Sequence, residues 1–478
     1  MALRKSETRS VPTRAGRAKR GAVVAVLSVG LLSTSAPSSL VPRASAAPAD
    51  PPPNVVLIVT DDQRWDTLWA MPNVQSLLGS RGVTFSNAFV VNPTCCPSRA
   101  SILTGRYSHS TGVWTNDPPY GGFTAFDDSS TLATWLDDRG YRTALMGKYL
   151  NGYHEVGTRT QYIPPGWDRW WAFLSPGYFD YTVNDGGVLR TYGADPTDYS
   201  TDVMAAEAVD FITQNQQPFF LYFAPKAPHL PSTPAPRHAD AFADLPPWRP
   251  ASWNETKIAD KPRWLRRVAS LTDADAAALD GRRIDMLRTL LALDEAVGDI
   301  VTALEQNGSL ADTMIVFTSD NGYAWGEHRW KRKGAPYDEV IRVPSVVRFD
   351  RVGTIGTVDP HLVLNIDLAP TIADAVGFDA PGAEGMSLLR LLRSEAPPWR
   401  HDLLVEHSAS RVPSFCALRS KRYSYVRYST GEEELYDLFR DPLQLKNQAR
   451  RRRMASLVGV YRGRLAELCS SPPPGMIL

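Results

Sequence analysis

Cysteine is scarce in this sequence, with four residues among 478. Cys95 and Cys96 are adjacent, whereas Cys416 and Cys469 lie far down the chain. Four cysteines are too few for a disulfide scaffold, and these spacings fit no structural zinc site. An exported protein could form a single Cys416–Cys469 bridge.

A long apolar segment is lacking as well. The apolar run over residues 21–32 is too short to span a membrane comfortably. It follows a basic segment over residues 14–20 and precedes the small residues Ala44-Ser45-Ala46. This order predicts a secretory signal peptide over residues 1–46, and the unpaired arginines favour the general secretory route. We therefore expect a secreted or cell-wall-associated protein without stable membrane insertion.

The chain has no large excess of charge of either sign. Residues 1–46 contain eight of the 52 basic and one of the 51 acidic side chains, which leaves 44 basic against 50 acidic residues, about −6. This balance excludes a net-charge argument for nucleic-acid binding. The run Arg450–Arg453 is interpreted as a solvated helix face, with contact to a polyanion as the weaker alternative.

Short, continuous apolar runs are what the sequence does contain. Runs of this length predict strands that are buried on both faces of a parallel sheet. Each run is followed directly by polar residues, and ligands of an open parallel sheet bind beyond the carboxyl ends of its strands. We expect these polar residues to converge on one rim. The runs cover residues 54–60, 142–146, 219–224 and 314–318.

Helical patterns over residues 201–214 and 284–304 alternate with these runs, which predicts a doubly wound α/β domain. Short strand-like segments then predict a small antiparallel sheet, with one final helix around residues 455–468. The strand-like segments are 403–406, 414–418, 423–428 and 434–438. The predicted division is a signal peptide at 1–46, a proline-rich leader at 47–53, a catalytic domain at 54–375 and a C-terminal subdomain at 376–478.

The segment Thr94–Arg106 carries the most informative motif. Pro97 fits the first turn of a helix, where the free N–H groups and the helix dipole favour an anion. Cys95 would then lie at an anion site. Arg99, four residues further on, can return along one helix face to balance charge there.

The pattern Cys95-x-Pro97-Ser98-Arg99, followed by Leu103-Thr104-Gly105, resembles the signature of type I sulfatases. The resemblance implies an alkaline-phosphatase-like α/β sandwich with a large, mostly parallel sheet flanked by helices. It also implies that a formylglycine-generating enzyme oxidises Cys95 to Cα-formylglycine. One hydroxyl of the hydrated aldehyde attacks sulfur, and the other allows the aldehyde to re-form as sulfate leaves.

Asp61, Asp62, Asp320 and Asn321 follow two of the predicted strands. Either pair alone is a common turn or cap sequence. Together with Cys95 they match the metal site of the sulfatase family, and hard oxygen ligands beside a sulfate suit Ca²⁺.

Three further residues match sulfatase motifs in the family's order: Lys148, His229 and Lys333. The resemblance implies that His229 and Lys333 contact the sulfate and help to protonate the leaving oxygen, and that Lys148 steadies the sulfated or aldehyde state. Many sulfatases have a histidine where this chain has Leu150. His154 or Asn151 could take over its role.

The segments 147–153, 162–170 and 178–184 look like those of N-acetylglucosamine-6-sulfatases and heparan 6-O-endosulfatases. Their aromatic residues could stack on a sugar or aryl group at the rim, or pack on the domain as a hydrophobic lid. The expected substrates are sulfated carbohydrates, such as 6-O-sulfated N-acetylglucosamine, or aryl sulfates. The alternatives are a phosphonate or phosphate ester hydrolase with the same formylglycine, and a non-catalytic protein that binds sulfated carbohydrate.

Overall fold

The four strands expected from the apolar runs lie side by side in the computed structural model, which describes residues 51–155, 161–215, 218–353, 355–408 and 411–477. Their order is β8-β1-β7-β3, and all four are parallel. Each prediction was right to within one residue at either end. The strands are β1 (Asn54–Thr60), β3 (Arg142–Gly147), β7 (Phe219–Ala224) and β8 (Thr313–Ser319).

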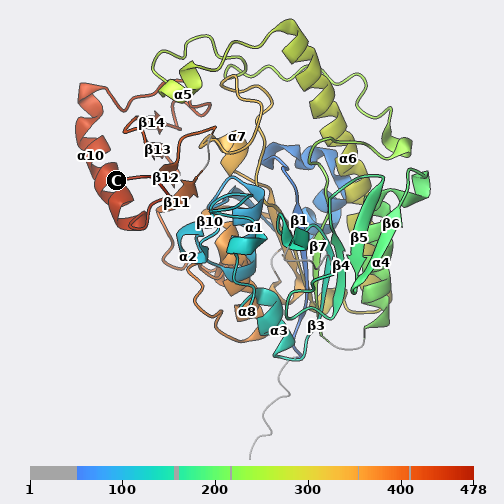
Figure 1. Cartoon of the computed structure of the whole chain (residues 1–478). Helices are drawn as coiled ribbons and strands as arrows, with labels where there is room; N and C mark the ends of the chain where they lie inside the picture. The colour runs from blue at the N-terminus through green and yellow to red at the C-terminus, as the bar shows by residue number, and fades with distance from the viewer. Residues whose placement is uncertain (1–50, 156–160, 216–217, 354, 409–410, 478) are drawn as a thin grey trace, which may run out of the picture. The chain divides into compact units, whose positions relative to one another are not determined.

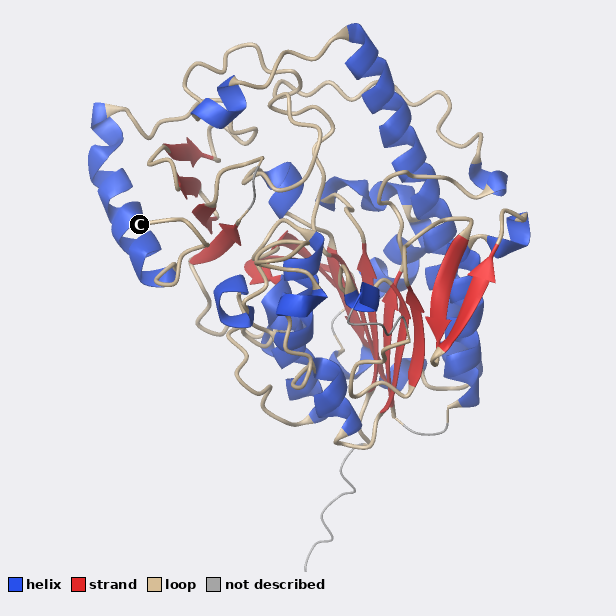
Figure 2. Ribbon diagram, in the orientation of Figure 1, coloured by secondary structure: helices blue, strands red, loops and turns tan. Residues whose placement is uncertain are grey.

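Six more strands extend this centre to a ten-stranded sheet of order β10-β2-β9-β8-β1-β7-β3-β4-β5-β6. β9 runs antiparallel to both of its neighbours, and so does β5. The sheet is therefore mixed with a parallel centre, which confirms the predicted large, mostly parallel sheet (Figure 2). The added strands are β2 (Val83–Phe89), β4 (Arg169–Phe173), β5 (Tyr181–Asp185), β6 (Val188–Tyr192), β9 (Ser345–Phe349) and β10 (Thr357–Leu364).

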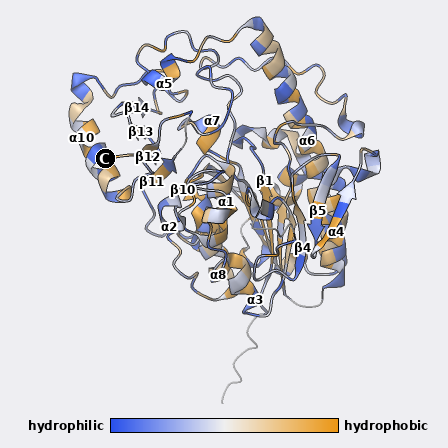
Figure 3. Ribbon diagram, in the orientation of Figure 1, coloured by the Kyte–Doolittle hydropathy of each residue, from blue (hydrophilic) through white to orange (hydrophobic). Residues whose placement is uncertain are grey.

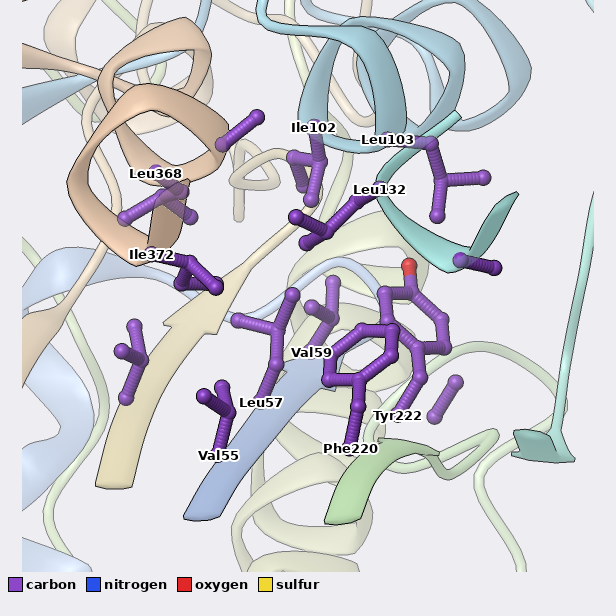
Figure 4. Close-up of a cluster of buried hydrophobic side chains, with 14 of the residues drawn as sticks. Val55, Leu57, Val59, Ile102, Leu103, Leu132, Phe220, Tyr222, Leu368 and Ile372 are labelled. Carbon is purple, nitrogen blue, oxygen red and sulfur yellow. The ribbon is translucent and has the colours of Figure 1, made fainter. Parts of the chain in front are cut away.

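Helices cover both faces of this sheet. The side chains of β1 alternate between the faces, and those of Val55 to Thr60 are buried. Leu57 and Val59 pack with Ile102 and Leu132 on one face (Figure 4). Val56 and Ile58 belong to the cluster on the other face. The first face carries α1 (Cys95–Thr104), α3 (Leu132–Asp137) and α8 (Leu368–Val376), and the second carries α4 (Ser200–Gln214) and α6 (Asp273–Gln306) (Figure 1).

Helix α6 begins eleven residues before the predicted start at residue 284. Its first turn is fixed by a capping box in which the Thr272 hydroxyl accepts from the Asp275 N–H and the Asp275 carboxylate accepts from the Thr272 N–H. The extra turns are less buried than the later ones, so they lack the apolar spacing on which the prediction relied. Figure 3 shows hydrophobic and hydrophilic residues mixed along this helix.

The C-terminal part forms a four-stranded antiparallel sheet with one helix, as predicted. The Cys416–Cys469 disulfide is present and joins the second strand to the end of the helix. The elements are β11 (Asp402–His407), β12 (Phe415–Ser420), β13 (Tyr423–Tyr428), β14 (Glu433–Asp437) and α10 (Ala455–Leu468). Four helices of a single turn complete the set: α2 (Ser108–Thr111), α5 (Arg263–Arg266), α7 (Asp338–Ile341) and α9 (Leu389–Leu392).

The structure decides between the two alternatives left open for the aromatic segments. They supply strands β4 and β5 of the main sheet, and Trp170, Trp171 and Tyr181 are buried in the core. These rings pack on the domain, as the second alternative held, but as part of the sheet and not as a lid. The exposed run Arg450–Arg453 precedes α10 and enters a short 3-10 turn, so it does not form a helix face.

Other predictions are not tested by the fold. The expected signal peptide at 1–46 and the first part of the proline-rich leader lie outside the described residues. The division at residue 375 stays a prediction. Among the residues that the structure describes, no helix combines the length and apolarity needed to cross a bilayer.

Candidate active site

The polar residues after the central strands meet at one rim, as the sequence predicts. Asp61 and Asp62 follow β1, Asp320 and Asn321 follow β8, and Lys148 follows β3. The parallel register continues past the strand ends, because the Asp320 N–H donates to the Thr60 carbonyl over 3.1 Å. All four metal-ligand candidates are at most 1% exposed.

Asp62 turns the chain at this rim. Its backbone φ is +68°, a left-handed conformation that lets the two consecutive carboxylates point to different partners. The Asp62 N–H donates to Asp320 Oδ1 over 3.1 Å, and Asn321 Nδ2 donates to Asp62 Oδ1 over 2.6 Å. These bonds hold the two polar pairs together.

Cys95 is the first residue of α1, after an extended Thr94, and it is 1% exposed. Its Sγ lies 3.4 Å from Asp61 Oδ1 and 3.9 Å from Asp62 Oδ1. Burial, reinforced by the nearby Asp320 carboxylate, raises the pKa of the Cys95 thiol far above its usual range, so the unmodified thiol stays protonated near neutral pH.

Cys96 has a different environment. Its side chain belongs to the hydrophobic cluster under the sheet, while its backbone N–H donates to Asn116 Oδ1 over 2.9 Å. Burial raises the pKa of its thiol to about 12. Of the two adjacent cysteines, Cys95 is the one whose sulfur contacts the carboxylates of Asp61 and Asp62.

Three cations neutralise the three buried carboxylates. Lys148 Nζ lies 2.6 Å from Asp61 Oδ2, and Lys333 Nζ lies 2.7 Å from Asp62 Oδ1 and also contacts the sulfur of Cys95.

Arg99 Nε donates to Asp320 Oδ2 over 2.7 Å. Arg99 thus turns toward the charged centre as expected, but its partner is a carboxylate on another strand. Each carboxylate therefore has its own cation.

Asp61 and Lys333 are held in their charged forms despite their burial. Burial alone would raise the pKa of Asp61, but Lys148, His229 and Arg99 hold it well below its usual range. Burial would also lower the pKa of Lys333, and the Asp62 carboxylate keeps it well above the usual range. The rim is a dense array of fixed charges in which each member depends on its neighbours.

His229 completes the predicted set. Its Nε2 lies 3.6 Å from Asp62 Oδ2, and its Nδ1 donates to the Leu230 carbonyl over 2.5 Å. Burial lowers the pKa of this imidazole, and the Asp61 and Asp62 carboxylates oppose that effect. With Nδ1 committed to a carbonyl, Nε2 is the nitrogen that faces the reacting centre.

The rim fits a hard divalent cation. Asp61, Asp62 and Asp320 supply carboxylates, and Asn321 Oδ1 is a buried oxygen without a hydrogen-bond partner among the described residues. An orphaned carbonyl oxygen beside three carboxylates is the donor set that Ca²⁺ prefers. One ligand atom from each of Asp61, Asp62, Cys95 and His229 also lies within 4.8 Å of the others.

A cleft of about 830 Å³ opens above this rim. Asp62, Thr94, His229 and Lys333 line its floor. The residues of its walls were not predicted from the sequence. They come from the loop after α2, the segment around Lys333 and the C-terminal part. These wall residues include Asp117, Tyr120, Tyr323, Trp330, Arg332, His407, Ser408, Arg411, Val412, Ser414 and Pro474.

Leu150 occupies the position at which many sulfatases have a histidine, and it makes apolar contacts. Leu150 is 3% exposed and belongs to the hydrophobic cluster that includes the helix residues of α1. His154 packs edge-on against the Tyr153 ring, and neither it nor Asn151 lines the described cleft. The structure therefore assigns the missing role to neither residue.

Two protein-family models match this chain. A family model described as sulfatase matches residues 53–378. A second model, described as the C-terminal part of N-sulphoglucosamine sulphohydrolase, matches residues 326–471. The second match covers the small antiparallel sheet.

Individual relatives point the same way. The chain is 37% identical to human N-acetylglucosamine-6-sulfatase, over 74% of this chain and 67% of the relative. It is 33% identical to a putative extracellular sulfatase Sulf-1 homolog of Caenorhabditis elegans, over 80% of this chain but only 56% of the relative. A solved structure in complex with D-glucosamine-2-N,6-O-disulfate has the same fold, with a TM-score of 0.76 and 24% identity over 88% of this chain and 98% of that one. By sequence, fold and the residues at its rim, the chain belongs to the sulfatase family.

Proposed function

We propose that this protein is an exported, calcium-dependent sulfatase that hydrolyses sulfate monoesters through a formylglycine made from Cys95. The observation that carries the proposal is the position of residue 95. It lies within 3.9 Å of Asp61, Asp62 and Lys333, two of which, Asp62 and Lys333, line the open cleft. Partners of this proposed activity are a sulfate ester and a formylglycine-generating enzyme.

Asp61, Asp62, Asp320 and Asn321 would hold the calcium ion. When bound, calcium supplies positive charge that offsets a sulfate oxygen and makes a hydroxyl on residue 95 easier to ionise. Arg99 acts behind the site, where it neutralises Asp320 and keeps that carboxylate aimed at the rim. The chain thus presents oxygen ligands on one side and cations on the other.

The hydrated aldehyde at position 95 supplies a nucleophilic hydroxyl that no unmodified side chain provides. Lys333 lies beside residue 95 and faces the cleft, so its ammonium group can hold a sulfate oxygen. Lys148 pairs with Asp61 and balances negative charge there. The two lysines therefore neutralise different carboxylates, and Lys333 alone of the two contacts residue 95.

His229 is the proposed proton donor to the leaving oxygen. Its Nε2 faces the rim while its ring is fixed through Nδ1, and it lines the cleft where the alcohol part of the ester must lie. General acid assistance of this kind contributes about 10²–10⁴-fold, because an alkoxide is a poor leaving group.

The cleft favours a sugar sulfate as substrate. A volume of about 830 Å³ exceeds what a sulfate group alone requires, and Tyr120 offers a half-exposed ring in its wall. Arg332 and Arg411 add two exposed cations outside the rim. Together with the N-acetylglucosamine-6-sulfatase relative, these features support a 6-O-sulfated amino sugar, with aryl sulfates as small test substrates.

The decisive experiment combines mass spectrometry with a substrate panel. Protein from a host that contains a formylglycine-generating enzyme should carry an aldehyde in the Cys95 peptide. It should hydrolyse aryl sulfates and 6-O-sulfated N-acetylglucosamine faster than matched phosphate and phosphonate esters. Active protein in which residue 95 is still cysteine would contradict the formylglycine route, and faster phosphonate hydrolysis would contradict the sulfatase assignment.

A further inference from the structure

Tyr178 makes a direct hydrogen bond to the backbone of His229. It lies between β4 and β5, far from residue 229 in sequence, and its side chain is 3% exposed. The Tyr178 hydroxyl donates to the His229 carbonyl oxygen over 3.0 Å. Tyr178 does not line the cleft, so its effect on the reaction would be transmitted through His229.

The tyrosine is itself held in place on several sides. Its ring stacks on Tyr199, with ring centroids 5.9 Å apart and an interplanar angle of 23°. Its carbonyl accepts from the Ser200 N–H over 3.0 Å. Lys226 Nζ donates to the Pro176 carbonyl over 2.8 Å, which fixes the chain just before Tyr178. A rigid hydroxyl in a buried site is suited to hold a backbone segment.

His229 has few other fixed contacts. Its N–H donates to the Lys226 carbonyl over 2.8 Å, and its ring bonds to the carbonyl of the next residue, Leu230. The ring is therefore tied to its own short segment. The direction of Nε2 follows the direction of the backbone around residue 229, and Tyr178 is the side chain from another part of the chain that bonds this backbone.

We propose that Tyr178 is a positioning residue that aims His229 Nε2 at the leaving oxygen of the substrate. The inference rests on the proposed function. In the imidazolium form of His229, both ring nitrogens carry a proton. As the hydroxyl oxygen on residue 95 forms its bond to sulfur and the bond between sulfur and the leaving oxygen breaks, the Nε2 proton moves to that oxygen, which departs as a neutral alcohol and leaves a neutral ring with its proton on Nδ1. Displacement of a catalytic group by about 1 Å can cost about 10²-fold in rate, so the bond to the His229 carbonyl matters to the chemistry.

The test is a Tyr178→Phe variant assayed on a series of sulfate esters with progressively poorer leaving groups. 4-Nitrophenyl sulfate needs little protonation, so its kcat should stay within about twofold of the unchanged protein. Alkyl and sugar sulfates need a proton, and their kcat should fall about tenfold or more. KM should change little, because Tyr178 does not contact the substrate.

Tyr199→Phe is the matched control. Tyr199 belongs to the same ring stack, and its hydroxyl also donates to a backbone carbonyl, that of Thr233, over 3.1 Å. Its loss should leave the dependence on the leaving group unchanged. A second variant, Lys226→Met, releases the Pro176 carbonyl and should reproduce the Tyr178→Phe pattern more weakly.

The outcomes separate this inference from the proposed function. His229→Ala should steepen the dependence on the leaving group, and the same dependence in His229→Ala and the unchanged protein would overturn the proposed acid. If His229→Ala steepens it while Tyr178→Phe lowers kcat by one factor for all esters, or not at all, the positioning role alone is wrong.

Discussion

The floor and the walls of the cleft differ in the burial and the pairing of their charged side chains. On the floor, Asp61, Asp62 and Asp320 are buried and each is paired with a cation. On the walls, Arg332 and Arg411 are exposed, and neither has a salt-bridge partner in the described part of the chain. Removing a floor group leaves a buried charge without its partner, whereas removing a wall group leaves the rest of the protein intact. We therefore expect the floor to determine whether the proposed reaction occurs, and the walls to determine which ester is used.

Substitution of residue 95 should reduce the activity more than any other change near the floor. We expect Cys95→Ala to abolish turnover, a loss of more than about 10³-fold, because no other side chain supplies the nucleophile. Cys96→Ala should keep activity, since this thiol packs in the core. Both are measured by initial rates on an aryl sulfate with folding checked by circular dichroism. Equal losses in two folded variants would mean that the reacting position is misassigned.

Asp320→Asn tests the coupling of charges on the floor. The change leaves the buried Arg99 without its carboxylate, which should lower the free energy of unfolding by about 3–5 kcal/mol. Loss of a ligand should also weaken calcium binding at least about tenfold in calorimetry.

The control for this variant is Asp312→Asn, which removes a surface partner of Arg351 and should cost less than about 1 kcal/mol. Unchanged calcium affinity in Asp320→Asn would remove Asp320 from the proposed metal site.

Substitutions in the walls should change the substrate specificity without changing the rate on a small substrate. Arg332→Ala and Arg411→Ala should each lower kcat/KM for a sulfated disaccharide about tenfold, the loss of one charge-assisted contact. 4-Nitrophenyl sulfate, which does not reach the walls, should react within about twofold. Arg452→Ala, an exposed arginine outside the cleft, serves as the control. Equal losses on both substrates would place these arginines in the reaction itself.

His109 lies outside both the floor and the walls, and its substitution should have the smallest effect. It lies in α2, and its Nδ1 is 2.6 Å from Glu406 Oε1 on β11. Burial alone would lower its pKa, but Glu384 and Glu406 raise it to about 10. A raised pKa means that the stabilisation is complete below the unfolded value, near 6.5, and is lost as the pH rises through 10.

His109→Gln should therefore reduce the free energy of unfolding by about 2 kcal/mol at pH 6 and by much less above pH 10. Urea unfolding at several pH values measures this difference. The exposed His401 is the control, and its change to glutamine should have little effect at any pH. A His109→Gln loss that does not depend on pH would show that the pair contributes no charge interaction.

The sequence predicted the centre of the fold and the floor, and it failed where structure depends on distant contacts. β1 was predictable because five consecutive residues, Val55 to Val59, are apolar and fully buried. Strands β4 and β5 were missed because their aromatic residues suggested a loop, although tertiary packing places them in the core.

The floor was predictable because its residues directly follow strands. Arg99 shows the limit of that argument, since its partner Asp320 lies 221 positions away. His407 and Arg411 reach the cleft from the C-terminal part, and no local pattern marks them as neighbours of residue 95. Their position follows from how the small sheet packs on the large one, which short motifs do not encode.

The burial of residue 95 also implies that its proposed oxidation precedes folding. The folded chain exposes only 1% of this residue, so the active site of a modifying enzyme cannot reach it. The proposed oxidation must therefore take place while the segment is still extended, during synthesis or export. Under this proposal, protein that folds first would keep residue 95 as cysteine and stay inactive, and active material would require the modifying enzyme in the same cell.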